Sequence, residues 1–432
     1  MLNQPDGGTS MRVSTAFNTM LGIPGARVTS VSFEPGGIVV QLRQQRCHPE
    51  CPCGRPQRAV YDRSVRRWRH LDLGGTRLFL EAEIRRVRCS QCNRVRTEAV
   101  PWARPAARHS RDLQDVIAYM AQRMDKTTVT RLLRVSWEAV AKAVVDVVAD
   151  HLDVRRLDGL YRIGVDEVSY RKGHRYLTVV ADHDRAGAVV WAGEGRSAAT
   201  LDAFYEELGD DGCAQLQAVS MDMGPAFATA TSQRAPQARQ CVDPFHVVQL
   251  ANKAIDDTRR REWNAARRPR RDRGRPRADA AATTRQTSRW VKHTRWALLK
   301  DPDALNDDQL DALHRLRSER SPLYRCWQLK EGLRDLFRLR RPADAPRHLA
   351  WWLNWASHSR IPAFVSLAAT IRANRDRILA AVELGLSNSK LEGLNSKIRL
   401  INHRGYGHHS AAALISMIYL CCGGITVTLP FS

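Results

Sequence analysis

The 432-residue sequence predicts a multidomain α+β protein. Three observations support this class. Five cysteines lie between residues 47 and 92, among short runs of alternating apolar and polar residues that are typical of strands. Helical periodicity follows from about residue 111 to 152, and strands then alternate with helices from about 161 to 260. Because a domain usually takes roughly 100–200 residues, the chain is long enough for several modules.

The charge indicates the class of partner. The chain carries 68 Lys and Arg against 45 Asp and Glu, a net charge of +23, which favours a polyanionic partner such as nucleic acid. The longest apolar stretch, 411–422, is shorter than the ~20 residues of a membrane-spanning helix, and the N-terminus lacks the blocks of a secretory signal. We therefore expect a cytoplasmic protein with no membrane partner, in which clustered cysteines bind metal rather than form disulfides.

The cysteine cluster predicts a zinc ribbon with one structural Zn²⁺. Zinc prefers four soft ligands in a tetrahedron, and two tight turns on neighbouring hairpins supply that geometry. One pair forms a CxxC motif, and a second pair lies within residues 47–53. The spacing of the second pair leaves Cys47 as a rival ligand, and unrelated buried thiols are the alternative interpretation. The predicted ligands are Cys51, Cys53, Cys89 and Cys92.

The segment 126–145 has the form of two short helices separated by a turn. Ser136 is a suitable N-cap for the second helix. Trp137 and Lys142 fall on the exposed side of that helix, where a helix-turn-helix contacts DNA. A plain helical hairpin would show the same pattern, but the basic charge and the adjacent ribbon favour DNA binding.

Two aspartates occupy strand positions where a carboxylate is unusual. Asp166 lies in a buried apolar run, and Asp222 ends a later strand just before Met-Gly-Pro. Three antiparallel strands, a helix and a fourth strand are the order of an RNase H-like fold, in which the first and fourth strands are neighbours. We therefore expect the two aspartates to meet at one edge of the sheet. Strand alternation sends Glu167 to the opposite face from Asp166, so it is excluded.

A third acid is predicted from helical geometry. In the segment 387–401 an apolar stripe repeats at helical spacing, and Glu392 lies on the opposite, polar face. Asp166, Asp222 and Glu392 are thus the predicted catalytic residues, holding two Mg²⁺ (or Mn²⁺) ions for an in-line displacement at phosphorus. The residues predicted to contact DNA beside Glu392 are Lys390, Asn395, Lys397 and Arg399.

Two further groups have predicted roles. Asp243 and His246, at the end of a probable fifth strand, are accessory candidates near the metals, although a packed histidine is an equal alternative. A basic block, 259–277, has no hydrophobic period and is expected to contact flanking or target DNA. Its named candidates are Arg267, Arg268, Arg270 and Arg271.

Five motifs then occur in one order along the chain: Gly164-Val-Asp-Glu-Val-Ser-Tyr, Gly195-Arg-Ser-Ala-Ala-Thr-Leu, Val219-Ser-Met-Asp-Met, Asp243-Pro-Phe-His-Val-Val-Gln-Leu and Leu391-Glu-Gly-Leu-Asn-Ser-Lys-Ile-Arg. With them the chain resembles the ISL-three family of bacterial insertion-sequence transposases over most of its length. The resemblance implies a DDE transposase with a zinc ribbon, a helix-turn-helix and an RNase H-like core split by a helical insertion. Asp166, Asp222 and Glu392 match the family's triad one by one.

The resemblance further implies recognition of terminal inverted repeats and Mg²⁺-dependent strand cleavage and transfer. The implied partners are the double-stranded DNA of the transposon ends and target, bound at the nucleoid by a homodimer or larger synaptic complex. The Cys51-Pro-Cys53 spacing departs from the family's usual two intervening residues, which leaves the first zinc pair open.

The predicted boundaries are an N-terminal segment (1–30), the zinc ribbon (31–105), the helix-turn-helix (106–155), the core's first part (156–258), the basic and α-helical insertion (259–370) and the core's second part (371–432). Two other functions fit parts of this pattern. One is a DNA-binding regulator or inactive transposase relic, against which the acid triad argues. The other is an RNase H-like structure-specific nuclease, for which the N-terminal modules would be superfluous.

Overall fold

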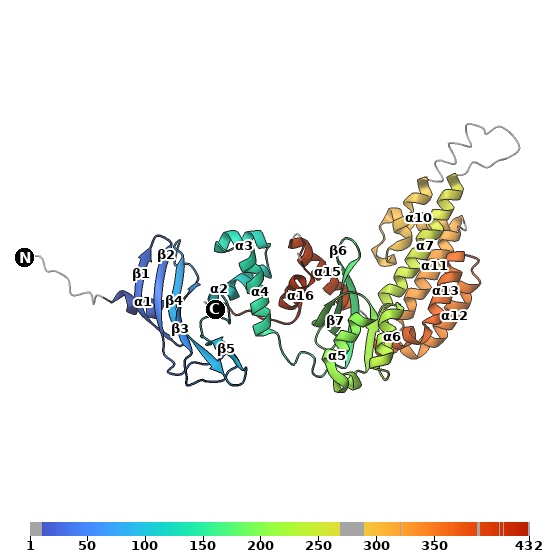
Figure 1. The fold of residues 1–432 in the computed structure, drawn as a ribbon. Helices are drawn as coiled ribbons and strands as arrows, with labels where there is room; N and C mark the ends of the chain where they lie inside the picture. The colour runs from blue at the N-terminus through green and yellow to red at the C-terminus, as the bar shows by residue number, and fades with distance from the viewer. Residues whose placement is uncertain are drawn as a thin grey trace, which may run out of the picture. The chain divides into compact units, whose positions relative to one another are not determined.

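The computed structural model describes residues 11–267, 289–319, 321–386, 389–405, 407–408 and 410–430, without the side chains of 267 and 389–392. The chain forms two compact units (Figure 1). The first comprises Met1–Asp153 with Ile401–Ser432, and the second comprises Val154–Leu400. In the described part of the chain, no helix has the length and apolar character needed to cross a membrane.

The first unit begins with a short helix and a five-stranded sheet in the order β1-β2-β4-β3, with β5 paired to β4. Side chains alternate between the two faces of a strand, so Leu78, Leu80 and Ile84 of β4 enter the core, where Trp68 meets Trp102 edge to face at 5.7 Å. The elements are α1 (Val13–Leu21), β1 (Ala26–Glu34), β2 (Gly37–Gln44), β3 (Asp62–Arg69), β4 (Leu78–Cys89) and β5 (Arg94–Thr97).

Four helices complete this unit: α2 (Arg111–Ala121), α3 (Lys126–Leu133), α4 (Trp137–His151) and α16 (Ala411–Cys422). Each of the three consecutive helices starts at a side-chain cap, and the predicted cap Ser136 accepts a hydrogen bond from the Ala139 backbone N–H at 3.2 Å. Arg134, with φ of 53°, ends α3 in the left-handed conformation, which turns the chain sharply into α4.

His70 joins the sheet to this helical group. Its Nδ1 lies 2.8 Å from the hydroxyl of Ser110, the N-cap of α2. Burial, with a smaller contribution from Arg69, lowers the pKa of His70 to about 4. The imidazole is therefore neutral in the folded protein at pH 5, whereas in the unfolded chain it is mostly protonated.

The neutral His70 makes stability depend on pH. The pKa of the His70 imidazole is lower in the folded protein than in the unfolded chain. Its contribution to the free energy of unfolding is therefore complete above about pH 6.5 and is lost as the pH falls toward 4. Between pH 7 and 5 we expect β3 to lose about 2 kcal/mol of opening free energy. Hydrogen exchange of the zinc-loaded chain, corrected for intrinsic rates, measures this loss. His70→Gln should remove most of the dependence, and an equal loss in both proteins would contradict this assignment.

The second unit contains a five-stranded sheet in the order β10-β9-β6-β7-β8. β6 pairs antiparallel with β7, and β7 with β8, whereas β6 with β9 and β9 with β10 are parallel. The predicted strand order β6, β7, β8, helix, β9 is therefore observed. The elements are β6 (Arg162–Arg171), β7 (Arg175–Asp182), β8 (Ala188–Glu194), α5 (Ala198–Gln215), β9 (Ala218–Met221), α6 (Pro225–Arg234) and β10 (Arg239–Val242).

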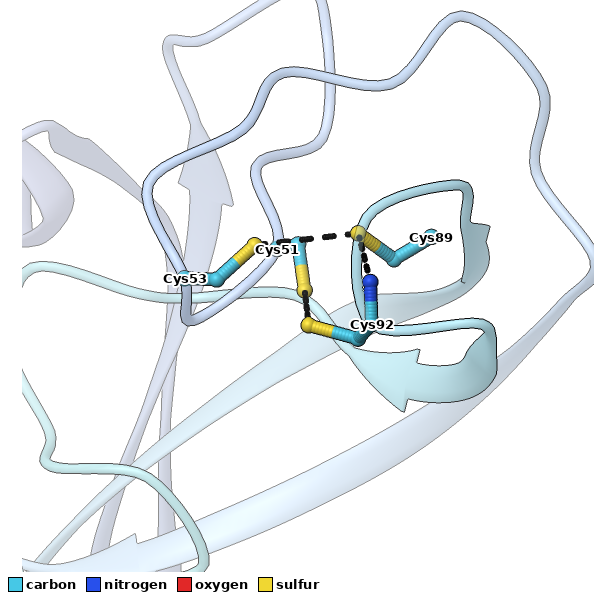
Figure 2. Close-up of side chains that lie close together, drawn as sticks. All are labelled: Cys51, Cys53, Cys89 and Cys92. Carbon is cyan, nitrogen blue, oxygen red and sulfur yellow. Dashed lines mark hydrogen bonds between the residues drawn. The ribbon is translucent and has the colours of Figure 1, made fainter.

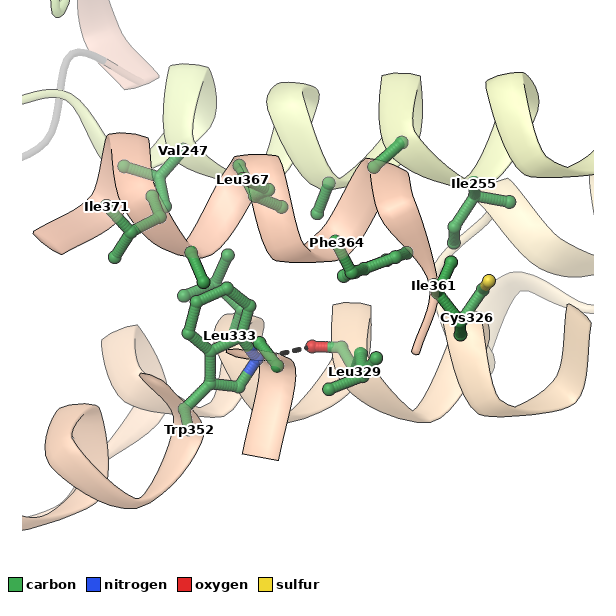
Figure 3. Packing of buried hydrophobic residues seen from close by; sticks show 14 of the residues in the cluster. Val247, Ile255, Cys326, Leu329, Leu333, Trp352, Ile361, Phe364, Leu367 and Ile371 are labelled. Carbon is green, nitrogen blue, oxygen red and sulfur yellow. Dashed lines mark hydrogen bonds between the residues drawn. The ribbon is translucent and has the colours of Figure 1, made fainter. Parts of the chain in front are cut away.

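A helical segment follows the sheet, with its own apolar core (Figure 3). Trp352 is fully buried there and donates its indole N–H to the carbonyl of Leu329 at 2.7 Å, which satisfies its polar atom. The elements are α7 (Pro244–Arg267), α9 (Arg295–Leu299), α10 (Asp307–Ser318), α11 (Pro322–Asp335), α12 (Ala345–Ser357), α13 (Pro362–Ala373), α14 (Arg375–Leu384) and α15 (Ser389–Arg404), with short 3-10 turns at Pro302–Ala304, Leu336–Arg338 and Pro342–Asp344.

Candidate functional site

Three aspartates lie at one edge of the second unit's sheet. The parallel pairing of β6 and β9 ends at Gly164 opposite Ser220, and Asp166 and Asp222 each stand two residues beyond that pair. Asp243 follows β10, whose last residue pairs with Met221, and its backbone N–H donates to the Met221 carbonyl at 3.0 Å. Register therefore brings the carboxyl ends of β9 and β10 level with Asp166, which lies in the middle of β6.

Asp166 is half-buried and held by two donors. The Glu167 backbone N–H donates to its Oδ1 at 2.7 Å, and the Asn395 amide donates to its Oδ2 at 2.5 Å. Asn395 comes from α15 and is itself buried. Burial raises the pKa of the Asp166 carboxyl, and these two hydrogen bonds partly offset that effect because they favour the ionised form.

Asp222 is held by the turn that follows β9. The Gly224 backbone N–H donates to Asp222 Oδ1 at 2.8 Å, and a Cβ at Gly224 would lie only 2.9 Å from that oxygen. Pro225 then starts α6, as the sequence predicted. From α14, Arg377 donates to the Asp222 backbone carbonyl at 3.0 Å and to the Asn374 side chain at 3.1 Å.

Arg377 contacts the turn that carries Asp222, and the sequence prediction did not include it. Nothing in its helical context separates it from the exposed arginines around it. On the transposase activity that the resemblance implies, we expect Arg377→Met to lower cleavage of end DNA about 10- to 100-fold with DNA affinity unchanged, because loss of a charged hydrogen bond frees the Asp222 turn. Cleavage rates measured beside equilibrium binding test this.

Arg375→Met is the matched control for Arg377, since Arg375 lies on the same helix with its side chain 48% exposed. Arg377→Lys should recover part of the rate. Equal losses in the Arg375 and Arg377 variants would argue for a general effect of charge on catalysis instead.

Glu167 interacts electrostatically with both aspartates, although strand alternation assigned it to the opposite face from Asp166. Burial raises the pKa of its carboxyl, and the negative charges of Asp222 and Asp166 raise it further, whereas Arg196 lowers it. β6 extends past the end of its pairing with β9, so Asp166 and Glu167 both lie on the part of the strand that is paired with β7 but not with β9. Glu167 therefore contributes to the site's negative charge.

The two accessory candidates also lie at this edge. Asp243 is only 2% exposed, and its Oδ2 is 3.9 Å from His246 Nε2. The charge of His246 lowers the pKa of Asp166, and that of Asp243 raises it, so both residues act electrostatically on Asp166. The edge thus gathers carboxylates with one imidazole beside them.

The remaining predicted residues of this unit divide into three groups. Glu392 and Lys390 belong to α15, but their side chains lie outside the described residues. Lys397 and Arg399 are exposed on the same helix, whereas Asn395 faces Asp166. Of the basic block, Arg267 ends α7 without a described side chain, and Arg268, Arg270 and Arg271 lie outside the described residues.

The first unit brings the four predicted zinc ligands together (Figure 2). Their sulfur atoms all lie within 4.8 Å of one another, with Cys51 to Cys92 at 3.9 Å and Cys53 to Cys89 at 3.7 Å. One pair lies in the loop between β2 and β3, and the other flanks the turn between β4 and β5. Cys47 is exposed and does not belong to the cluster.

The cluster's chemistry suits a structural zinc ion. The Cys92 backbone N–H donates to Cys89 Sγ at 3.5 Å and lowers the pKa of that thiol to about 6, whereas contact with the Cys53 thiol raises the pKa of Cys92 and burial raises that of Cys51. A thiolate is the form that binds zinc, and four closely spaced sulfurs are the donor set of closed structural sites. The predicted four-cysteine set is therefore compatible with one structural Zn²⁺, despite the short Cys51-Pro-Cys53 spacing.

Comparison with known proteins places these features in one family. Residues 163–418 match a transposase model of family ISL3, the ISL-three family of the sequence prediction. Residues 98–148 match the helix-turn-helix domain of transposase family ISL3, and residues 39–92 match the zinc-finger of transposase IS204/IS1001/IS1096/IS1165. The chain belongs to the ISL3 transposase family.

Two relatives of this ISL3 transposase cover nearly all of its length. The transposase for insertion sequence element IS1557 of Mycobacterium tuberculosis is 40% identical over 437 residues, covering 97% of this chain and 98% of the relative. The transposase for insertion sequence element IS1001 of Bordetella parapertussis is 30% identical over 390 residues, covering 89% of each chain. The predicted family is thereby confirmed.

The helix-turn-helix of the ISL3 transposase is formed by α3 and α4. Trp137 is 38% exposed, and the Lys126 ammonium lies 4.8 Å from its ring centroid. Lys142 is exposed and forms an ion pair with Asp146 on the same helix. Both predicted DNA-contacting residues are thus accessible on α4, the position of a recognition helix.

Proposed function

We propose that this ISL3 transposase binds the terminal inverted repeats of its insertion sequence and catalyses metal-dependent DNA cleavage and strand transfer. The proposed catalytic triad is Asp166, Asp222 and Glu392. The single observation that carries this proposal is the register of β6 and β9, which leaves Asp166 and Asp222 two residues beyond the same paired position.

The sheet topology supports an RNase H-like core. Across the sheet the strands lie in the order β8-β7-β6-β9-β10, which is 3-2-1-4-5 when they are numbered along the chain. β8, β7 and β6 pair antiparallel, whereas β6, β9 and β10 pair parallel. On this proposal the helices after α7 form an insertion between the second and third acids. The domain boundaries predicted from the sequence are part of the same proposal.

The donor set at the sheet edge fits magnesium. Mg²⁺ is bound through one or two carboxylates and retains several waters. Among the residues that the structure describes, the side-chain hydrogen bond of Asp222 uses Oδ1, which leaves Oδ2 for a ligand. A divalent cation would also relieve the repulsion between Glu167 and Asp222. When bound, two such ions supply a nucleophile and stabilise the leaving oxygen of an in-line displacement.

The chain's own residues hold this arrangement in place. Asn395 and the Glu167 backbone fix both oxygens of Asp166, so its carboxylate cannot rotate freely. Gly224 and Arg377 fix the turn that carries Asp222. Because both acids are fixed before substrate binds, little reorganisation is needed at the moment of reaction.

The first unit supplies DNA binding in this proposal. Trp137 and Lys142 on α4 would contact the transposon end, and the structural zinc would hold the ribbon. Lys390, Lys397, Arg399 and the basic block would contact flanking or target DNA, with a homodimer or larger synaptic complex at the nucleoid holding two ends together.

The proposal is tested by incubating the zinc-loaded chain with labelled duplexes that carry its inverted repeat. We expect cleavage at the repeat's boundary and joining to a second duplex, with Mg²⁺ or Mn²⁺ required. A duplex with a scrambled repeat is the control. Specific binding without any strand cleavage would favour the regulator or inactive relic, and cleavage of hybrids or junctions without preference for the repeat would favour the nuclease.

A further inference from the structure

A basic groove lies in the first unit where the zinc-ribbon sheet meets the helix-turn-helix. Its volume is about 520 Å³. The sheet side contributes Arg69, Arg77 and Phe79, and the loop before α2 contributes Arg108 and His109. The other wall is the turn after α3 and the first two turns of α4. The groove is therefore built by both modules together.

The charge of this groove is strongly one-sided. Its basic lining residues are Arg69, Arg77, Arg108, His109, Arg134 and Lys142, against one acid, Glu138. Arg69 pairs with Asp72, as does Arg134, and Lys142 pairs with Asp146. Arg77 and Arg108 are exposed and form no ion pair with any residue that the structure describes.

The cations are close enough to act on one another. Burial is the main cause that lowers the pKa of Arg69, and the charges of Arg134 and Arg77 lower it further. The ion pair with Asp72 acts in the opposite direction but does not cancel these effects. The charges of Arg69 and Arg108 likewise lower the pKa of His109, which burial has already lowered. A bound polyanion would reduce the repulsion between these closely spaced positive charges.

The two walls are held in a fixed relation. Asp72, just after β3, pairs with Arg69 on the sheet and with Arg134 in the turn between α3 and α4. The Arg69 backbone also bonds to residues 108 and 110, and Leu71 packs into the apolar core shared by α2, α3 and α4. The spacing between the sheet's arginines and the recognition helix is therefore rigid.

We propose that this groove binds the backbone phosphates of the transposon-end duplex directly beside the base pairs that α4 contacts. The occupant is inferred from charge and position, because the N-terminal residues of a recognition helix contact base edges and the flanking strand then runs along the groove. Ribbon and helix-turn-helix act on this account as one DNA-binding surface, with Arg77 and Arg108 as its phosphate ligands. The inference rests on the proposed function.

The test compares double variants of the full, zinc-loaded chain by fluorescence anisotropy over a series of salt concentrations. Each protein is measured on the end duplex and on a scrambled duplex. Arg77→Gln with Arg108→Gln should weaken binding to both duplexes about 100-fold, since a charged hydrogen bond is worth about tenfold or more. The slope of log K against log salt should fall by about two, at ~0.9 per phosphate contact.

Two controls separate the groove from overall charge. Arg341→Gln with Arg347→Gln removes the same charge from exposed residues of the second unit, whose side chains are 85% and 84% accessible, and should leave the slope unchanged. Arg77→Lys with Arg108→Lys keeps the charge and should keep the slope, although the loss of bidentate geometry weakens binding.

The outcomes distinguish the two proposals. The proposed phosphate-binding role of the groove would be wrong if the salt slope of the glutamine variant were unchanged, or if the slope fell equally in the Arg341 and Arg347 control. It would also be wrong if the wild-type chain bound neither duplex. If the wild-type chain binds both duplexes equally and the salt slope is lower in the groove variant, the phosphate-binding role of the groove is supported. The proposed recognition of the inverted repeat is then contradicted.

Discussion

Asp222→Asn is expected to abolish Mg²⁺-dependent cleavage and joining of end DNA while leaving DNA binding intact. The substitution keeps the shape of the side chain but removes the negative charge that, on the proposed function, binds metal at the carboxyl end of β9. A metal ion's contribution of several kcal/mol to the transition state corresponds to a loss of roughly a thousandfold in rate. Single-turnover cleavage of a labelled end duplex, with binding measured on the same samples, tests this.

Asp211→Asn is the matched control for Asp222→Asn. Asp211 is exposed on α5 of the same unit, so the change in net charge is the same but no loss of rate is expected. If the Asp222 variant cleaves and joins as well as wild type, the proposed triad is wrong. A fall in binding as large as the fall in rate would instead indicate that Asp222 acts in DNA positioning.

Cys89→Ser is expected to release the zinc ion and unfold the ribbon's metal-binding end. Structural zinc contributes roughly 10–16 kcal/mol of apparent binding free energy at pH 7, and a hydroxyl does not replace the thiolate. The surrounding apolar cluster is small, with only Cys51, Val87 and Cys89 buried in it, so it cannot hold the two turns alone. Metal content by atomic absorption should fall from one equivalent to near zero.

The loss of order in the Cys89 variant should be local. The sheet has its own core around Trp68, Leu78 and Leu80, so we expect hydrogen exchange to increase in the loop between β2 and β3 and in β5, but not in β4 near Leu80. Cys47→Ser is the control, because Cys47 is exposed outside the cluster, and it should retain its zinc. Equal zinc loss in both variants would make Cys47 a ligand.

Much of the fold is predictable because its signals are local. Alternation predicted the strands that became β2 and β4, a buried apolar run predicted β6, and the cap at Ser136 predicted the start of α4. The run from Asp222 to Pro225 predicted the end of a strand and the start of a helix. Each signal comes from residues that are close together in the sequence, within one or two helical turns or within one or two strands. Their spacing along the chain alone defines their relative positions.

The candidate site was predictable only in part. Asp166 and Asp222 were predicted because a carboxylate within a buried apolar strand, or at its end, is unusual, and the strand order then made them neighbours. Arg377 gave no such signal, since an arginine on a helix is most often solvated. Glu167 was assigned to the opposite face by alternation, and its charge nevertheless interacts with those of Asp222 and Asp166.

The sequence by itself determined the family, a zinc site that includes Cys89 and Cys92, the order of strands and helices, and the sheet edge where Asp166 and Asp222 lie, because each follows from local spacing and residue chemistry. The structure was needed to choose Cys51 and Cys53 over Cys47 for the other pair. Only the tertiary structure decided that Asn395 bonds to Asp166, that Arg377 holds Asp222, and that ribbon and helix-turn-helix share one basic groove. These contacts join residues far apart in the chain, and their geometry depends on how apolar faces pack rather than on any periodicity along the sequence.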